Sequence, residues 1–132
     1  MLIEVNKLVV CRLNRKLIKS ALSQAYKIAK SRKKINMISV ALVDKKAIRI
    51  LNRKYRRVDK VTDVLAFDDP AEIVICRDQL VRQAEEQKHG QNRELIILLI
   101  HGLLHILGYD HRFKKDKMKM RRMEEKILQL IG

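Results

Sequence analysis

The stretch LIILLIHGLLHILGYDHRF, residues Leu95–Phe113, decides how the rest of this chain is organised. It begins as an apolar run and then places His101, His105 and His111 within eleven residues. Because His101 and His105 are four residues apart, a helix would bring both side chains to one face, about one turn apart. Gly108 is a natural end for that helix, since glycine readily adopts the left-handed conformation. The chain can then turn and bring His111 back toward the other two histidines.

Three imidazoles directed at one point form a metal site that leaves one coordination position for water, which is the arrangement of catalytic zinc. Two histidines in an apolar helix could instead be core residues satisfied by hydrogen bonds. The third histidine favours metal binding, because three of the chain's four histidines fall in this window. The sequence therefore predicts one zinc ion per chain. The fourth histidine, His89, is expected at the surface near a helix end.

The same histidine spacing occurs in metzincin proteases, which carry glutamate directly after the first histidine as the general base. In this chain that position is Gly102. A protease interpretation therefore lacks its base within the motif and is the weaker alternative.

Positive charge is concentrated in the first part of the chain. Residues 1–60 contain 18 Lys and Arg against 3 Asp and Glu, whereas residues 61–132 contain 12 of each, so the net charge of +15 arises before residue 61. A lysine-rich solvated surface is one interpretation. We favour a polyanionic partner, because Lys and Arg displace counterions from nucleic-acid phosphates. The lack of tryptophan argues against a purely membrane-surface role.

The 132 residues are expected to form one domain, residues 1–132, with an α+β fold. Four strands of a small mixed sheet are predicted at residues 1–5, 35–43, 62–67 and 72–76, the last two as an antiparallel hairpin. About five helices are predicted to cover the sheet. Their expected starts are Asn14 and Asp44 as caps, Asp78, Asn92 as the cap of the central helix, and Lys114.

The apolar residues of the predicted helices recur at helical spacing. The central helix carries the metal-binding histidines and is apolar nearly all round, so we expect it to be buried on several sides. In the helix that starts at Asp44, the shared apolar face is expected to consist of Ala47, Ile48, Leu51 and Tyr55. In the helix that starts at Lys114, the inward face is expected to consist of Met120, Met123, Ile127 and Leu130.

The two cysteines, Cys11 and Cys76, are isolated in apolar surroundings and show no spacing of a disulfide framework. We interpret both as small core residues in a reducing compartment. No secretory signal is apparent, and the apolar run Leu95–Leu107 is too short to span a bilayer. We therefore expect a soluble cytoplasmic protein with no membrane partner.

Two segments together resemble a known family. HGLLHILGYDH at residues 101–111 is similar to the metal motif of the YbeY-type ribosomal-RNA maturation endoribonucleases. LNRKYRRVDKVTDVLAF at residues 51–67 resembles the second signature of that family, LNxxYRxxDxPTDVLSFP. The strand EIVIC stands where the family has a G-D-I-x-I segment. The resemblance covers most of the chain from Val40 onward.

The resemblance implies that His101, His105 and His111 bind a metal, usually zinc, and that Arg56 is the functional arginine near the active site. It also implies a single-strand-specific endoribonuclease that matures the 3′ end of 16S rRNA, acts in ribosome quality control and associates with the small subunit. We expect zinc to acidify water and polarise a phosphoryl oxygen, while the Arg56 guanidinium stabilises charge on phosphorus. The basic first helix and residues Arg49–Lys60 would hold the RNA backbone.

The chain departs from the family pattern at Val61, Ala66 and Glu72, where the family usually has proline, serine and aspartate. These changes concern the substrate groove and leave the histidines and Arg56 intact. Asp110, beside His111, is either an orienting residue or a turn former. The alternative function is a non-catalytic RNA-binding factor of ribosome assembly whose metal is structural. The sequence leaves the oligomeric state open.

Overall fold

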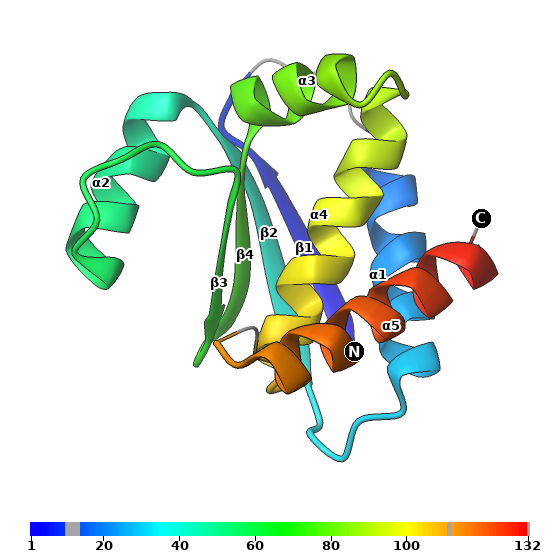
Figure 1. The fold of residues 1–132 in the computed structure, drawn as a ribbon. Coiled ribbons are helices and arrows are strands. Elements are labelled where there is room, and N and C mark those ends of the chain that lie inside the picture. The colour runs from blue at the N-terminus through cyan, green and yellow to red at the C-terminus, as the bar shows by residue number, and fades with distance from the viewer. Residues whose placement is uncertain (10–13, 111, 132) are drawn as a thin grey trace.

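The computed structural model describes residues 1–9, 14–110 and 112–131, so Cys11 and His111 lie outside the described residues. Within the described part, the chain folds into one mixed sheet of four strands and five helices (Figure 1). The α+β prediction is therefore confirmed. Across the same described residues, none of the helices combines the length and the apolar character that a membrane crossing requires.

The strand order across the sheet is β1-β2-β4-β3. β1 (Leu2–Lys7), β2 (Met37–Val43) and β4 (Ala71–Cys76) run parallel, and β3 (Val64–Asp68) pairs antiparallel with β4 as the predicted hairpin. The central strand β2 is apolar on both faces because helices cover both sides of the sheet there. Because β3 stands last in the strand order, it is an edge strand. It also borders a groove.

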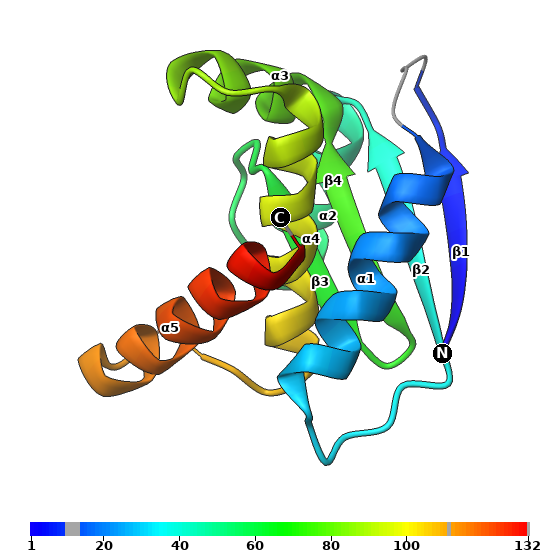
Figure 2. The same ribbon diagram turned by 90° about the vertical axis from the view of Figure 1, so that its right-hand side faces the viewer.

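Helices lie on both faces of the sheet (Figure 2). α1 (Arg15–Ala29) and α4 (Gln91–Ile106) share the main core on one face, and α5 (Lys114–Ile131) packs across them. α2 (Lys45–Arg56) covers part of the opposite face with a smaller apolar cluster, and α3 (Arg77–Glu86) follows β4 directly at one end of the sheet. The histidine helix α4 is the most buried of them, with nine of its residues in the core.

Two of the three predicted helix caps are confirmed. The Asn14 side-chain oxygen accepts a hydrogen bond from the backbone N–H of Lys16, and Asp44 does the same for Ala47, both at 2.8 Å. The prediction that Asn92 caps α4 is wrong, because Gly90 is the N-cap and the helix begins at Gln91. The buried Glu94 lies in the first turn of α4.

Two side chains predicted to face inward are exposed. Tyr55 is 57% exposed at the end of α2, and Leu130 is 63% exposed. On α5 the inward face runs from Ile127 to Ile131, four residues further along, and this rotates Leu130 toward solvent. On α2 the small apolar cluster extends only to Leu51, so the last turn of the helix reaches beyond it.

Candidate active site

The two described histidines of the motif lie side by side on α4, as their spacing predicts. Their ring centroids are 4.7 Å apart at an angle of 74°, and the two Nε2 atoms are 3.1 Å apart. Both rings are half-buried at the open face of a helix whose other sides are in the core. The pair is therefore held by a rigid element while remaining accessible to a ligand.

A carboxylate from α5 orients the first histidine. The Oε1 atom of Glu124 lies 3.0 Å from Nδ1 of His101. Since a carboxylate accepts hydrogen bonds, Nδ1–H is the donor, and the neutral ring then has its lone pair on Nε2. Metal-binding histidines commonly show this arrangement. No local sequence pattern reveals this role of Glu124, because only the folded chain brings α5 against α4.

The geometry fits a shared metal ion. Two nitrogens on one tetrahedral zinc, each about 2.0–2.1 Å from it, are separated by about 3.3 Å. The observed separation of the two Nε2 atoms, 3.1 Å, is close to that value. Among the residues that the structure describes, no group of three His, Cys, Asp or Glu side chains gathers as a metal site. The predicted third ligand, His111, lies outside these residues.

The turn that leads toward position 111 forms as predicted. Gly108 has φ +98°, and its N–H donates to the carbonyl of His105 at 3.0 Å. The next N–H, that of Tyr109, donates to the carbonyl of Leu104 at 2.9 Å, and together these bonds close the helix end. Asp110 then accepts a hydrogen bond from the backbone N–H of Arg112, so it has the turn-forming role that the sequence offered as one alternative.

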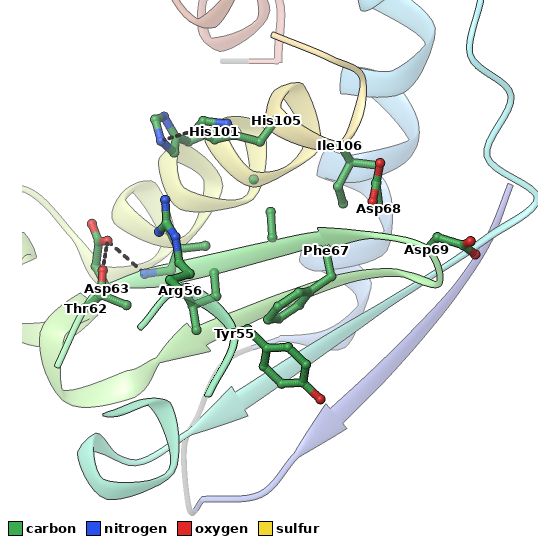
Figure 3. Close-up of a pocket in the computed structure, with 14 residues that line it drawn as sticks. Tyr55, Arg56, Thr62, Asp63, Phe67, Asp68, Asp69, His101, His105 and Ile106 are labelled. Carbon is green, nitrogen blue, oxygen red and sulfur yellow. Dashed lines mark hydrogen bonds between the residues drawn. The ribbon is translucent and has the colours of Figure 1, made fainter. Parts of the chain in front are cut away.

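The histidines border a groove of about 660 Å³ between β3 and the C-terminal half of α4 (Figure 3). Arg56 comes from the end of α2 and lines the groove, and Figure 3 shows its guanidinium directed toward the α4 side. Tyr55 and Phe67 lie along the same groove with their rings edge to face, 5.1 Å between centroids. The structure thus places Arg56 in one cavity with His101 and His105.

The loop after Arg56 is fastened to α2. Arg57 ends the helix in the left-handed conformation, with φ +58°. The buried side chain of Asn52 donates from Nδ2 to the carbonyl of Lys60 at 3.0 Å. Further out, Arg49 pairs with Asp59 at 2.8 Å, which raises the pKa of Arg49 and lowers the pKa of Asp59. These contacts fix where the chain leaves Arg56.

A lysine from the α1–β2 loop closes the other end of the groove. Lys33 Nζ donates to the carbonyl of Ile106 at 2.8 Å and lies 3.5 Å from the Asp68 carboxylate. A cation at this place satisfies a carbonyl at the C-terminal end of α4 and complements the helix dipole. The two residues of the hydrogen bond are 73 positions apart, so no local sequence signal could reveal it.

Close packing against β4 explains why position 102 is glycine and not the glutamate of the protease motif. A Cβ atom at this position would lie 3.0 Å from Cγ2 of Ile73 on β4. Glycine lets α4 approach the sheet closely, and any larger residue here would require the Ile73 side chain to shift by a few tenths of an ångström.

The buried thiol of Cys76 is not suited to act as a nucleophile, because desolvation raises its pKa. For Cys76, the predicted core position is confirmed.

His89 lies just beyond the end of α3 as predicted, but its side chain is half-buried and not fully at the surface. Its Nε2 atom lies 2.7 Å from Oε1 of Glu94, and only 20% of the His89 side chain and 7% of the Glu94 side chain are exposed. A buried carboxylate needs such a partner. The pair joins the α3–α4 turn to the first turn of α4.

The comparisons with known proteins agree with this geometry. A family model described as Endoribonuclease YbeY matches residues 4–132. The curated Endoribonuclease YbeY of Desulfitobacterium hafniense is 42% identical over 112 residues, which cover 72% of this chain and 71% of that protein. The counterpart from Carboxydothermus hydrogenoformans is 42% identical over 104 residues, covering 73% of each.

A solved structure is similar as well. The solution structure of a Thermotoga maritima protein superposes with a TM-score of 0.67 at 28% identity, covering 97% of this chain and 87% of that one. Fold, groove and relatives together define a hydrolase that cuts RNA within the strand. The chain belongs to the YbeY endoribonuclease family, as the resemblance implied. This family is generally metal-dependent.

Proposed function

We propose that residues 1–132 act as one zinc-dependent endoribonuclease domain that cleaves single-stranded RNA in the groove between β3 and α4. One observation carries the proposal. His101 and His105 direct their Nε2 atoms at a common point, 3.1 Å apart, in a groove that Arg56 also lines. An RNA substrate follows from membership of an endoribonuclease family.

The proposed zinc ligands are His101, His105 and His111. Glu124 holds the His101 ring so that the unprotonated Nε2 atom faces the groove. When bound, zinc would supply Lewis acidity to a phosphoryl oxygen and lower the pKa of a nearby water. The protein's part is to keep the ligand nitrogens in place, and burial of the rest of α4 supports that task.

Arg56 is the proposed catalytic residue on the opposite wall. Cleavage of a phosphodiester bond places additional negative charge on the oxygens around phosphorus. A guanidinium is always protonated and has two parallel N–H groups that match two phosphoryl oxygens. Because Arg56 is anchored at the end of a helix, it can meet this charge without a large rearrangement.

The RNA backbone is proposed to contact the basic residues of α1 and the stretch Arg49–Lys60. α2 ends at the groove, whereas α1 packs beside α4 on the other face of the sheet. Phosphate contacts of this kind do not depend on base sequence. RNA affinity should therefore fall steeply as salt rises, and a flat salt response would contradict this assignment.

For the physiological role, we propose maturation of the 3′ end of 16S rRNA and ribosome quality control in the cytoplasm, in association with the small ribosomal subunit. The support is the pair of sequence signatures at residues 51–67 and 101–111 together with the family membership.

The test is cleavage of an end-labelled single-stranded RNA by the purified protein and two arginine variants. Arg56→Ala should lower kcat/KM by about 10²–10³-fold, the usual cost of one group that stabilises transition-state charge. Arg53→Ala removes the same charge one turn earlier on α2, from a separate surface depression. Because Arg53 belongs to the proposed backbone-binding stretch, its loss should raise KM, but it should change kcat by less than about threefold.

Zinc content and melting temperature of all three proteins should stay equal. Equal loss in the two arginine variants would mean that bulk charge, and not the place of Arg56, matters. A wild type that binds RNA without cutting it would instead support the non-catalytic assembly factor.

A further inference from the structure

A second cavity, of about 380 Å³, continues the groove beyond His101. It shares His101 and Asp63 with the groove, and it lies between α3 and the first half of α4. Figure 1 shows α3 lying over this end of α4. We call this cavity the α3 chamber; its other lining residues are Gln83, Gln87, His89, Glu94, Ile97 and Leu98.

The charges of the α3 chamber disfavour a phosphate. Asp63 and Glu94 both contribute carboxylates, and among the described residues that line it none is Lys or Arg. A polyanion backbone would be repelled there. Ile97 and Leu98 provide an apolar wall. A group with an apolar face and a polar edge suits such a chamber, and a nucleobase has both.

The polar edge of the α3 chamber is held in a fixed orientation. Asp63 Oδ1 accepts a hydrogen bond from the backbone N–H of Val64 at 2.8 Å, and Oδ2 accepts one from Gln83 Nε2 at 3.1 Å. The bond through Nε2 assigns the Gln83 oxygen as that amide's acceptor. Thr62 Oγ1 also donates to Oδ1, at 3.4 Å, so the acceptor that this carboxylate keeps for a ligand is the second lone pair of Oδ2. Asp63 and Gln83 therefore present a fixed set of acceptors.

The buried Glu94 adds to this acceptor character. Its carboxylate is fixed by His89 at 2.7 Å. Gln87, at the C-terminal end of α3, also lines the chamber and has an amide that can donate. The chamber is thus richer in acceptors than in donors, and it favours a ligand edge that carries N–H groups.

We propose that the α3 chamber is a nucleobase subsite that accepts adenine, cytosine or guanine and disfavours uracil, at the nucleotide next to the scissile phosphate. This inference rests on the proposed function, because the groove must hold that phosphate. Adenine, cytosine and guanine carry an exocyclic amino group with two N–H donors, whereas uracil has a single N3–H between two carbonyl oxygens that the carboxylates would repel. Single-stranded RNA exposes these edges for recognition.

The test measures binding separately from cleavage. Tetranucleotides of cytidine, adenosine or uridine with 2′-O-methyl groups, which resist cleavage, are titrated into ¹⁵N-labelled protein. The side-chain amide resonances of Gln83 and Gln87 should shift with the cytidine and adenosine tetramers. Their dissociation constants should be about tenfold below that of the uridine tetramer, the discrimination expected from one good base contact.

Three variants decide the assignment. Gln83→Met and Gln87→Met keep the side-chain length but remove the amide, and each should reduce the discrimination to less than about threefold. Gln129→Met changes an exposed glutamine in a separate depression on α5 and should leave the discrimination intact. Equal affinity for the three tetramers in the wild type would overturn the inference, as would full discrimination in both chamber variants.

Cleavage mapping on an RNA with random sequence then separates the subsite from the proposed function. Wild-type cuts should be depleted in uracil at one position beside the break, and Gln83→Met should restore uracil there. Discrimination in binding without any cleavage would reject the proposed nuclease while supporting the base subsite. Cleavage with no positional preference would support the nuclease and overturn the subsite.

Discussion

The two walls of the groove are built very differently. On α4, nine residues are buried, and the histidines project from the one open face of a core helix. On α2, only Ile48 and Asn52 are buried, and Arg56 stands in the last turn. The first wall is therefore rigid, while the second depends on a few hydrogen bonds at a helix end. The proposed metal ligands and the proposed phosphate-binding cation are thus not equally preorganised.

Removing a ligand from the rigid wall should have the largest effect. His105→Ala deletes one of two converging nitrogens but leaves the core of α4 intact. Zinc affinity, measured by competition with a chromogenic chelator, should fall by more than about 100-fold, beyond the loss usual for an orienting partner. The circular dichroism spectrum should not change. Unchanged zinc affinity would show that the two histidines serve the core and not a metal.

A smaller loss of zinc affinity should follow from loosening the other proposed ligand, His101, through its hydrogen-bond partner. Glu124→Gln weakens the acceptor of the His101 Nδ1–H and should lower zinc affinity by about 10–100-fold. Glu125→Gln is the matched control, since Glu125 is exposed beside Arg121 on the same helix. If both variants bind zinc equally well, Glu124 has no orienting role.

The difference in burial between the walls should also appear in stability. Leu99→Ala opens a cavity in the fully buried part of α4 and should lower the free energy of unfolding by about 2–5 kcal/mol. Ile50→Ala, at a half-exposed position of α2, should cost less than about 0.5 kcal/mol. Urea unfolding of both variants measures the contrast, and similar costs would contradict the assignment of α4 as the core helix.

The weakest expected effect concerns the loop after Arg56. The Arg49 guanidinium lowers the pKa of Asp59, so the pair contributes stability above the unfolded pKa of aspartate, about 3.9, and loses it as the pH falls through the lower folded pKa. Both groups are exposed, and the contribution is small. Asp59→Asn should slightly flatten the acid side of a stability–pH curve, and an unchanged curve would show that the pair adds nothing.

Local patterns were sufficient for most of the fold. The apolar spacing predicted the order of the strands and helices, and Gly108 predicted where α4 ends. Errors occurred where packing between elements decided the outcome. His89 is half-buried because its side chain pairs with the buried Glu94 across the α3–α4 turn. Leu130 was misplaced because the inward face of α5 follows Ile131.

In the candidate site, too, contacts within one helix were predictable from the sequence, whereas contacts between distant elements were not. The spacing of His101 and His105 predicted their juxtaposition, because both lie on one helix. Glu124 and Lys33 reach α4 from elements far away in sequence, and only tertiary packing brings them there. The family resemblance predicted that Arg56 lies near the active site, and Arg56 does line the groove. The sequence of its own helix shows only a run of basic residues and does not single out Arg56.

The most direct measurement is the zinc dependence of RNA cleavage by the wild-type protein. Protein stripped with a chelator should keep its fold but lose cleavage of labelled single-stranded RNA, and one equivalent of zinc per chain should restore it. His105→Ala should remain inactive after the same addition. Full activity in the stripped wild type, or equal activity in His105→Ala, would contradict the account of a metal-dependent nuclease centred on these histidines.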